Sequence, residues 1–456
     1  MQQVELSQEQ QALFKYIEGE HTNIFVTGRA GTGKSTLLSH LIENTKKTFA
    51  VCAPTGVAAL NVGGQTIHSL FGFPFGLLGT EDVARHLNKR NREVLKSIEM
   101  LVIDEISMVS ADLLDGMNRM MIAARGRNRG PFGGAQVVMF GDPYQLAPVP
   151  PGDPSERAWL AENYQSNWFF DAHVWRDADL ERYELSEIFR QHDEEFKEIL
   201  NAIRDGSCTQ EMLDRLNKAG NRFAPNDDII RLCTVNQTVD SINSTRLHKL
   251  TTTPKTFEAR FASGDAQSFG RSLPVEPTLV LKIGAQVMFI KNDDQSNRKT
   301  KDGLMVRRWV NGTIGHVTDI LNENHLVVEV DGEELDVTIS TWQKVRYEIE
   351  EDFDEATQKF KEIVVPVTLA EYQQIPLRLA WAVTVHKSQG QTYEEVIVDM
   401  GRGAFSPGQT YVALSRVRSL EGLYLTRAIT MRDIMVDNDV RRFMNGKTNA
   451  AIERLF

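Results

Sequence analysis

The chain has 456 residues, of which 41% are hydrophobic and 25% charged. This composition is typical of a globular protein and excludes an apolar-poor, highly charged disordered chain. At roughly 100 to 200 residues per domain, the length predicts about three domains. The net charge of -11 argues against a uniformly basic nucleic-acid binder, so any groove for nucleic acid has to be local.

Cysteine usage and the amino terminus indicate a cellular compartment. Cys52, Cys208 and Cys233 are too few and too scattered for a disulfide framework or a metal cluster, which favours a reducing environment. The first residues lack the basic start and apolar segment of an export signal, and no stretch approaches the roughly 18 apolar residues of a membrane span. We therefore expect a soluble cytoplasmic protein.

A phosphate-binding loop is the strongest local signal. The β-rich run 23–27 leads into Gly28-Arg-Ala-Gly-Thr-Gly-Lys-Ser35, which matches the G-x-x-x-x-G-K-[ST] pattern at every fixed position. Glycines let backbone amides turn towards phosphate, the lysine reaches the β and γ oxygens, and the serine can ligate Mg²⁺. The following run 36–42 predicts a helix whose amino end faces the anion. The residues predicted to bind nucleotide here are Gly28, Ala30, Gly31, Thr32, Gly33, Lys34, Ser35 and Thr36.

Two acids follow a second predicted strand. The uninterrupted apolar run 100–103 is typical of a buried parallel strand, and it ends in Asp104-Glu105. Asp104 is expected to hold Mg²⁺ with Ser35, and Glu105 to accept a proton from the attacking water. Acids at a strand end can also be ordinary surface residues, but the phosphate loop favours the catalytic interpretation.

Three further residues are candidates for contact with the γ-phosphate. The strand predicted at 136–140 is followed by Gly141-Asp-Pro-Tyr-Gln145, whose glutamine could sense that phosphate. Arg190 and Arg416 lie far downstream and could supply guanidinium groups across a cleft. Either arginine could instead be a plain surface residue.

The order of these segments resembles that of superfamily 1 helicases. It includes an early glutamine, the phosphate loop, Ala53-Pro-Thr-Gly56, Asp104-Glu105, Gly141-Asp-Pro-Tyr-Gln145, Arg190, His386-Lys-Ser-Gln-Gly390 and Ser415-Arg416. Within group B of that superfamily the chain resembles the petite integration frequency (Pif) family of DNA helicases. The segments that carry this resemblance are Thr66-Ile-His-Ser69, Asp104-Glu-Ile-Ser-Met108, Pro131-Phe-Gly-Gly134 and Tyr411-Val-Ala-Leu-Ser-Arg-Val417.

The resemblance implies further site residues. Gln10 would recognise adenine, with Gln8 as an alternative, and Gly390 would face the nucleotide. The residues expected to contact DNA are Thr55, Gly56, His68, Phe73, Asn236, Thr384, His386 and Lys387. Thr55 could instead cap the helix that begins after it, and His386 could be a core histidine.

The expected fold is α/β, with two RecA-like P-loop cores built on parallel sheets. Residues 1–182 would form the first core. The resemblance implies that an insertion at about 71–92 is a wedge that separates strands; it could instead be a hydrophobic loop packed on the core. Residues 183–253 and 367–456 would form the second core. Short β runs with Asn311-Gly312 and Asp331-Gly332 turns predict an inserted SH3-like β-barrel at 254–366. The acidic stretch 348–362 is not among the segments that carry the resemblance.

The predicted function is that of an ATP-dependent DNA helicase with Mg²⁺-ATP bound between the cores. By resemblance it would move 5′ to 3′ on single-stranded DNA and unwind duplex, forked or structured DNA, including G-quadruplexes or RNA-DNA hybrids, in repair, recombination or replication. We expect a monomer, nucleoid-associated if the source is bacterial. A translocase that strips proteins from DNA, a nucleotide-gated binding module and a small-molecule P-loop kinase are the alternatives.

Overall fold

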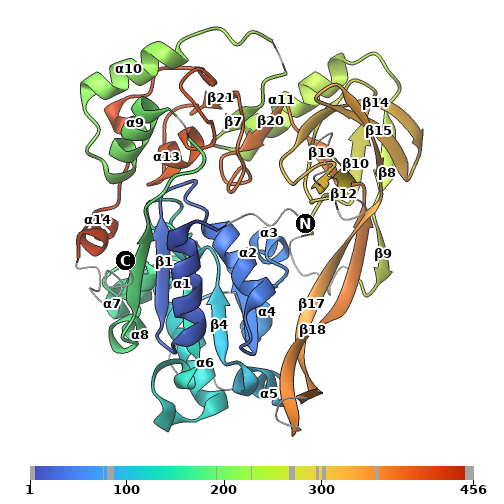
Figure 1. Cartoon of the computed structure of the whole chain (residues 1–456). Coiled ribbons are helices and arrows are strands. Elements are labelled where there is room, and N and C mark those ends of the chain that lie inside the picture. The colour runs from blue at the N-terminus through green and yellow to red at the C-terminus, as the bar shows by residue number, and fades with distance from the viewer. Residues whose placement is uncertain are drawn as a thin grey trace. The chain divides into compact units, whose positions relative to one another are not determined.

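The computed structural model describes residues 6–74, 76–79, 87–191, 193–226, 228–265, 273–293, 297–299, 305–354 and 359–446 (Figure 1). The chain divides into two compact units, each of which is described by itself. The first unit comprises residues 5–188, 344–369 and 437–456, and the second comprises 1–4, 189–343 and 370–436. None of the described helices is long and apolar enough to cross a membrane.

A six-stranded parallel sheet forms the centre of the first unit, in the order β3-β2-β4-β5-β1-β6. Its strands are β1 (Ile24–Gly28), β2 (Phe49–Ala53), β3 (Gln65–Thr66), β4 (Met100–Ile103), β5 (Gln136–Phe140) and β6 (Glu181–Leu185). Three of them, β1, β4 and β5, coincide with the runs that predicted strands, and these three and β2 are each buried along nearly their whole length. The α/β class with a parallel core is therefore confirmed.

Two helices cover one face of this sheet. α1 (Gln8–Gly19) contributes Leu13 and Ile17, and α2 (Lys34–Asn44) contributes Leu37 and Leu41, to a buried cluster with alternate residues of the strands. Figure 1 shows α1 and α2 in blue beside β1. The other helices of the unit are α3 (Gly56–Asn61), α4 (Ile67–Phe71), α5 (Lys89–Ser97), α6 (Ala111–Arg125), α7 (Pro154–Asn163) and α8 (His173–Asp177).

The carboxyl-terminal helix α14 (Asn438–Asn445) belongs to the first unit, which corrects the prediction that 367–456 lies wholly in the second core. Phe443 stacks on Phe170 with ring centroids 4.2 Å apart and meets Trp175 edge-on at 5.5 Å. Arg182 Nη1 donates to the Phe443 carbonyl at 2.8 Å. This aromatic cluster explains why the helix packs here.

The predicted boundary at 182 falls inside β6. That strand pairs with β1 along its whole length, from Glu181 opposite Ile24 to Leu185 opposite Gly28. The first unit therefore continues to Ile188, and the boundary prediction was early by several residues.

The second unit has its own four-stranded parallel sheet, in the order β20-β7-β21-β22. Its strands are β7 (Arg231–Cys233), β20 (Ala382–Thr384), β21 (Val396–Asp399) and β22 (Leu423–Leu425). Its helices are α9 (Glu194–Asp205), α10 (Gln210–Gly220), α11 (Asn236–Lys249) and α13 (Gln409–Leu414). This parallel sheet is the second core that the sequence predicted.

Antiparallel strands make up the rest of the second unit. A five-stranded sheet runs in the order β16-β15-β14-β11-β19, formed by β11 (Gln286–Phe289), β14 (Ile314–Asn322), β15 (His325–Val330), β16 (Glu333–Thr338) and β19 (Leu377–Leu379). The short β runs predicted in the insertion correspond to β11, β14, β15 and β16. Asp331 and Gly332 have φ of 52° and 80°, as a two-residue hairpin turn between β15 and β16 requires.

Smaller sheets complete this part of the chain. They are formed by β8 (Lys255–Glu258) with β10 (Thr278–Leu281), by β12 (Asn297–Lys299) with β13 (Met305–Arg307), and by β17 (Ser340–Asp354), β18 (Lys359–Gln374) and β9 (Arg260–Ser263). Residues 344–369 of β17 and β18 group with the first unit, whereas the prediction assigned 344–366 to the inserted domain and 367–369 to the second core.

The β17 segment contacts the first sheet through Tyr347. Its hydroxyl accepts a hydrogen bond from the Val51 backbone amide of β2 at 3.0 Å, and the side chain is 6% exposed. Next to it, Arg90 and Glu348 form an ion pair of 2.9 Å. The beginning of the acidic stretch 348–362 is thus paired with a basic residue, while residues 355–358 lie outside the described part of the chain.

Asp433 is the hub of a buried polar network near the end of the second unit. Its carboxylate accepts hydrogen bonds from Arg427 at 2.6 and 3.0 Å, from the amide and hydroxyl of Thr430 at 2.8 Å each, and from the Ala404 amide at 3.1 Å. These donors hold the pKa of Asp433 well below its usual range, although burial opposes them.

Asp433→Asn is expected to lower the stability of the second unit by about 1–3 kcal/mol at pH 7, because buried donors lose a charged acceptor. The folded-state pKa is depressed, so this stabilisation is present above the unfolded pKa near 4 and disappears as pH falls below it. Thermal melts of both proteins between pH 7 and pH 3 should show a gap that narrows on acidification. A gap that is constant with pH would contradict this account.

Candidate functional site

The predicted site residues of the first unit meet at one edge of its sheet. The phosphate loop follows β1, Asp104 and Glu105 follow β4, and Gln145 lies after β5. In parallel α/β sheets, ligands bind outside the carboxyl ends of the strands. The structure thus brings together side chains that are more than 100 residues apart in sequence.

The phosphate loop has the backbone geometry that its glycines predicted. Gly31 and Gly33 have φ of 85° and 77°, where a side chain would be strained, and a Cβ on Gly28 would lie 2.6 Å from Thr32 Oγ1. Gly33 is the N-cap of α2, so the first amides of this helix open towards the loop. Lys34 Nζ donates to the Gly28 carbonyl at 2.6 Å and the Arg29 carbonyl at 3.0 Å.

Gln10 lies against this loop and is 2% exposed. Its Oε1 accepts from the Ser7 amide at 3.0 Å, which completes a capping box at the start of α1. Its Nε2 donates to the Gly33 carbonyl at 3.2 Å. Adenine recognition by Gln10 stays a prediction, and it would require this amide to exchange those partners, whereas Gln8 is exposed.

Asp104 and Glu105 are held at the tip of β4 with an unusual backbone. Glu105 has φ of 51°, a left-handed conformation that is rare for residues other than glycine and that clusters at functional sites. Its amide donates to Asp104 Oδ1 at 2.9 Å. Burial raises the pKa of Asp104 to about 6, while the Glu105 amide and the charge of Lys34 oppose the shift.

This carboxylate fits the Mg²⁺ that the sequence predicted. A desolvated carboxylate next to a phosphate loop gains from a divalent cation, and Mg²⁺ is usually held by one or two carboxylate or hydroxyl groups together with substrate phosphates. Ser35 lies exposed in the first turn of α2 and would supply the hydroxyl. Among the described residues there is no cluster of three or more His, Cys, Asp or Glu side chains that could hold a metal unaided.

The turn after β5 holds Gln145 in a fixed orientation. Gln145 Nε2 donates to Asp142 Oδ2 at 3.3 Å, and Asp142 Oδ1 accepts from the Tyr144 amide at 3.2 Å. A Cβ on Gly141 would lie 2.8 Å from Ile106, so only glycine fits beside the segment that follows Glu105. The turn that carries Gln145 is therefore packed directly against the segment that carries the two acids.

The residues expected to contact DNA in the first unit follow β2 and β3. Thr55 caps α3 by accepting from the Ala58 amide at 3.2 Å, which confirms the helix-cap alternative for its side chain. Gly56 begins α3, and His68 lies in α4. Burial lowers the pKa of His68, with a partial opposing effect of Asp112, so this imidazole is neutral at pH 7.

Phe73 is not placed to stack on a base, which corrects the prediction for this residue. It is 6% exposed, and its ring is stacked on Phe71 with centroids 5.3 Å apart. The ring reaches Gly116 of α6, where a Cβ would lie 3.6 Å from it. The hydrophobic-loop alternative holds for the start of the insertion, while residues 75 and 80–86 of the predicted wedge lie outside the described residues.

In the second unit, the predicted DNA-contact residues also follow the carboxyl ends of strands. Asn236 begins α11 after β7 and is exposed. Thr384 ends β20, and its hydroxyl accepts from the Lys387 amide at 3.2 Å. His386 and Lys387 are exposed residues of the turn after β20, so His386 is not a core histidine. The protein around them is still close enough to remove part of their hydration, which lowers the pKa of each, and Arg378 adds to the effect on Lys387.

Arg190 and Arg416 lie close together in the second unit. Arg416 is 1% exposed and donates from Nε to the Val412 carbonyl at 2.9 Å and from Nη2 to Ser415 Oγ at 2.9 Å. Arg190 donates to the carbonyls of Ser415 at 3.2 Å and Gly390 at 3.4 Å. Burial, together with the charge of Arg416, lowers the pKa of Arg190 to about 9. Two desolvated guanidinium groups side by side favour an anion.

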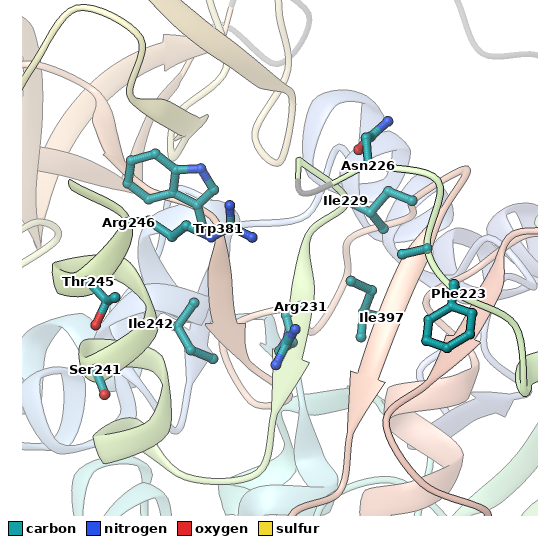
Figure 2. Close-up of a pocket in the computed structure, with 11 residues that line it drawn as sticks. Phe223, Asn226, Ile229, Arg231, Ser241, Ile242, Thr245, Arg246, Trp381 and Ile397 are labelled. Atoms are coloured by element: carbon teal, nitrogen blue, oxygen red, sulfur yellow. The ribbon is translucent and has the colours of Figure 1, made fainter. Parts of the chain in front are cut away.

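A hollow of about 400 Å³ lies elsewhere on the second unit. Figure 2 shows Arg231 and Ile397 at the start of β7 and β21, with Trp381 and Arg246 above them. This hollow lies at the amino ends of the parallel strands, whereas the predicted site residues follow the carboxyl ends. None of the predicted site residues lines it.

Gln191 and Asp142 are the polar residues in these sites that the sequence did not single out. Asp142 orients Gln145, and Gln191 donates from Nε2 to the Ser415 carbonyl at 3.1 Å. Asp142 lies inside a recognised motif, and Gln191 directly follows Arg190. Adjacency to a predicted site residue was thus the one signal that could have found them.

The fold and the first unit's site define a P-loop nucleotide-binding protein with two parallel-sheet cores. The PIF1-like helicase model matches residues 5–214. The ATP-dependent DNA helicase Pif1 of Bdellovibrio bacteriovorus is 32% identical over 97% of this chain and 92% of its own length. The chain belongs to the PIF1-like helicase family.

Other similar proteins are helicases of the same name. The ATP-dependent DNA helicase PIF1 of Rattus norvegicus is 36% identical over 92% of this chain, and the chain spans about three fifths of that relative's length. Pif1 from Bacteroides sp in complex with ADP-AlF4 is 35% identical, with a TM-score of 0.85 over 98% of both chains. Pif1 helicase from Bacteroides in complex with ADP-AlF3 and ssDNA is 36% identical, with a TM-score of 0.68 over 98% of this chain and 99% of that one.

Proposed function

We propose that this protein is an ATP-dependent DNA helicase that couples hydrolysis of Mg²⁺-ATP to movement along single-stranded DNA. One observation carries the proposal: the phosphate loop, Asp104, Glu105 and Gln145 converge at one sheet edge in a chain that belongs to a helicase family. The Bacteroides relative binds both ADP-AlF3 and ssDNA, which supports the same pair of ligands here.

Hydrolysis would be carried out by the strand ends of the first unit. Lys34 and the amides of residues 28–36 would hold the β and γ oxygens. Glu105 would accept the proton of the water that attacks the γ-phosphorus, and ADP would leave with the electron pair of the broken bond. Bound Mg²⁺, held by Ser35 and Asp104, would supply positive charge to the phosphates.

The groups of the second unit would complete the chemistry. Arg190 and Arg416 would stabilise negative charge on the γ-phosphate, with Gln145 sensing its presence and Gly390 lying near the nucleotide. The electrostatics of Arg190 support this role, because burial and the charge of Arg416 lower its pKa to about 9, and a neighbouring anion would stabilise its charged form. Gln10 would contribute to adenine recognition.

DNA would be held through its backbone by residues of both units. Thr55, Gly56 and His68 would contact it from the first unit, and Asn236, Thr384, His386 and Lys387 from the second. Lys387 is exposed in the turn after β20, so its ammonium group is accessible to a phosphate, which supports a phosphate contact. Amides, hydroxyls and neutral imidazole are sequence-independent phosphate donors, which suits a motor that moves over any sequence.

By resemblance to the family, the protein would act as a monomer that moves 5′ to 3′. It would unwind duplex, forked or structured DNA such as G-quadruplexes or RNA-DNA hybrids, and would take part in repair, recombination or replication. An SH3-like barrel formed by the antiparallel strands would provide a second wall over the DNA.

The ATPase rate should rise strongly when single-stranded DNA is added, and a duplex with a 5′ tail should be unwound while a 3′-tailed duplex is not. Phosphate release and strand displacement measure the two effects, with Lys34→Ala as the inactive control. Failure of DNA to stimulate ATP hydrolysis would rule out the motor. Unwinding from the 3′ tail alone would keep the motor and reject the proposed polarity.

A DNA translocase that removes bound proteins is the second candidate, because it would use every residue named above. Streptavidin displacement from biotinylated DNA distinguishes the two activities. ATP-dependent displacement without duplex separation would favour the translocase over the helicase.

A further inference from the structure

Gln191 connects the two segments that carry the arginines. It directly follows Arg190, is 2% exposed, and donates from Nε2 to the carbonyls of Ser415 at 3.1 Å and Val417 at 3.4 Å. These carbonyls belong to the residues on either side of Arg416. One buried amide therefore fixes the peptide that carries the second arginine to the peptide that carries the first.

The orientation of Arg416 depends on that same turn. Its Nη2 donates to Ser415 Oγ, which itself donates to the Val412 carbonyl at 3.0 Å. α13 ends at Leu414, so the carbonyls of the turn have no helical partner beyond it. A shift of the turn would move both the backbone and the guanidinium of Arg416.

The link also opposes an unfavourable interaction. Arg190 and Arg416 carry like charges in a desolvated environment, and the charge of Arg416 contributes to the lowered pKa of Arg190. Like charges at low dielectric repel strongly unless an anion lies between them. A neutral amide can hold the two segments together without adding an acid that would compete with phosphate for the guanidinium groups.

We propose that Gln191 is a positioning residue that sets the spacing of Arg190 and Arg416 for the γ-phosphate in the transition state. The inference rests on the proposed function, because it assigns both arginines to that phosphate. It predicts that removal of the amide slows hydrolysis while ATP binding is retained, since a displacement of about 1 Å can reduce a rate by about 100-fold.

Gln191→Met tests the proposal, because it keeps the length of the side chain and removes the donor. We expect kcat for ATP at saturating single-stranded DNA to fall by about 10- to 100-fold, with KM changed less than about twofold. Affinity for ADP with aluminium fluoride should fall in parallel with kcat, and affinity for a non-hydrolysable ATP analogue should be retained.

Gln374→Met is the matched control. Gln374 is 1% exposed and its Nε2 donates to the carbonyls of Phe257 and Pro277 at 3.0 Å each, in the antiparallel part of the same unit. It should suffer a comparable loss of stability with kcat retained. Equal kcat losses in the two variants, or a normal kcat in Gln191→Met, would overturn the positioning role.

Gln191→Glu adds a second measurement, the pH dependence of kcat, which would not change if Gln191 were only structural. An ionised carboxylate can only accept, so it repels both carbonyls, whereas the protonated acid regains one donor. The kcat defect relative to the unmodified protein should therefore shrink as pH falls, and a defect independent of pH would overturn the proposal. This variant also covers the case in which Gln191→Met fails to fold.

Arginine variants distinguish failure of this inference from failure of the proposed function. Normal ATPase activity in both Arg190→Ala and Arg416→Ala would remove the γ-phosphate role of the arginines, and the positioning role with it. Impaired arginine variants with a normal Gln191→Met would overturn the positioning role alone.

Discussion

Arg416→Ala is expected to lower the ATPase rate at saturating ATP and single-stranded DNA by about 10³- to 10⁵-fold. The guanidinium would stabilise charge on the γ-phosphate in the transition state, so its loss should reduce kcat far more than ATP affinity. Arg416→Lys should recover little, because an ammonium group cannot reproduce the planar fork that donates to two acceptors at once. Steady-state phosphate release together with equilibrium binding of a fluorescent ATP analogue separates the two quantities.

Arg418→Ala is the control for this experiment. Arg418 lies two residues further along and forms an exposed ion pair with Glu394, which contributes little to stability. Its removal should leave the rate within about threefold of the unmodified protein. Arg416 is buried, so thermal melting of both variants has to show a folded protein. A folded Arg416→Ala protein with a normal rate would remove this residue from catalysis.

The first sheet could be predicted from sequence because its strands are continuous apolar runs. In a parallel sheet covered on both faces every strand residue is buried, so β4 is apolar throughout and β5 is apolar after its first residue, Gln136. The phosphate loop was equally clear, because glycine at positions 31 and 33 is required by positive φ. In the strands and in the phosphate loop, the residue types that the structure requires are the same ones that form the sequence pattern.

Packing partners distant in the chain could not be predicted. The helix that carries Phe443 is short, and nothing in its own sequence indicates the aromatic cluster of Phe170 and Trp175 more than 260 residues earlier. The burial of Phe73 was missed for a similar reason, because an aromatic residue in an insertion suits either a base or the core. In the structure the Phe73 ring is buried and stacked on Phe71, which decides in favour of the core.

The sequence also could not show that some site side chains have a second, structural function. Gln10 was assigned to adenine, but it closes a capping box on α1 and holds the carbonyl of Gly33 at the same time. Thr55 was assigned to DNA with a helix cap as alternative, and its hydroxyl does cap α3. In both cases a motif residue also stabilises the local fold, so loss of the side chain would affect both.

Glu105→Gln should bind ATP normally and hydrolyse it about 10²- to 10⁴-fold more slowly, because the amide cannot accept the proton of the attacking water. The shape and the positive φ of this position are kept, since glutamine differs from glutamate in one atom. A single-turnover assay measures the hydrolysis step, and filter binding of labelled ATP measures affinity. The protein should then hold single-stranded DNA in its ATP-bound state.

Glu99→Gln is the matched control for Glu105, because it changes a carboxylate at the opposite end of the same strand. Glu99 precedes β4 and accepts from the Thr48 amide at 2.6 Å, at the amino edge of the sheet. Its replacement should alter stability by about 1 kcal/mol and leave hydrolysis unchanged. If both variants hydrolysed ATP at the normal rate, the general base would have to be another group. If only Glu105→Gln lost the step, the base would lie at the carboxyl edge of the sheet, with the phosphate loop.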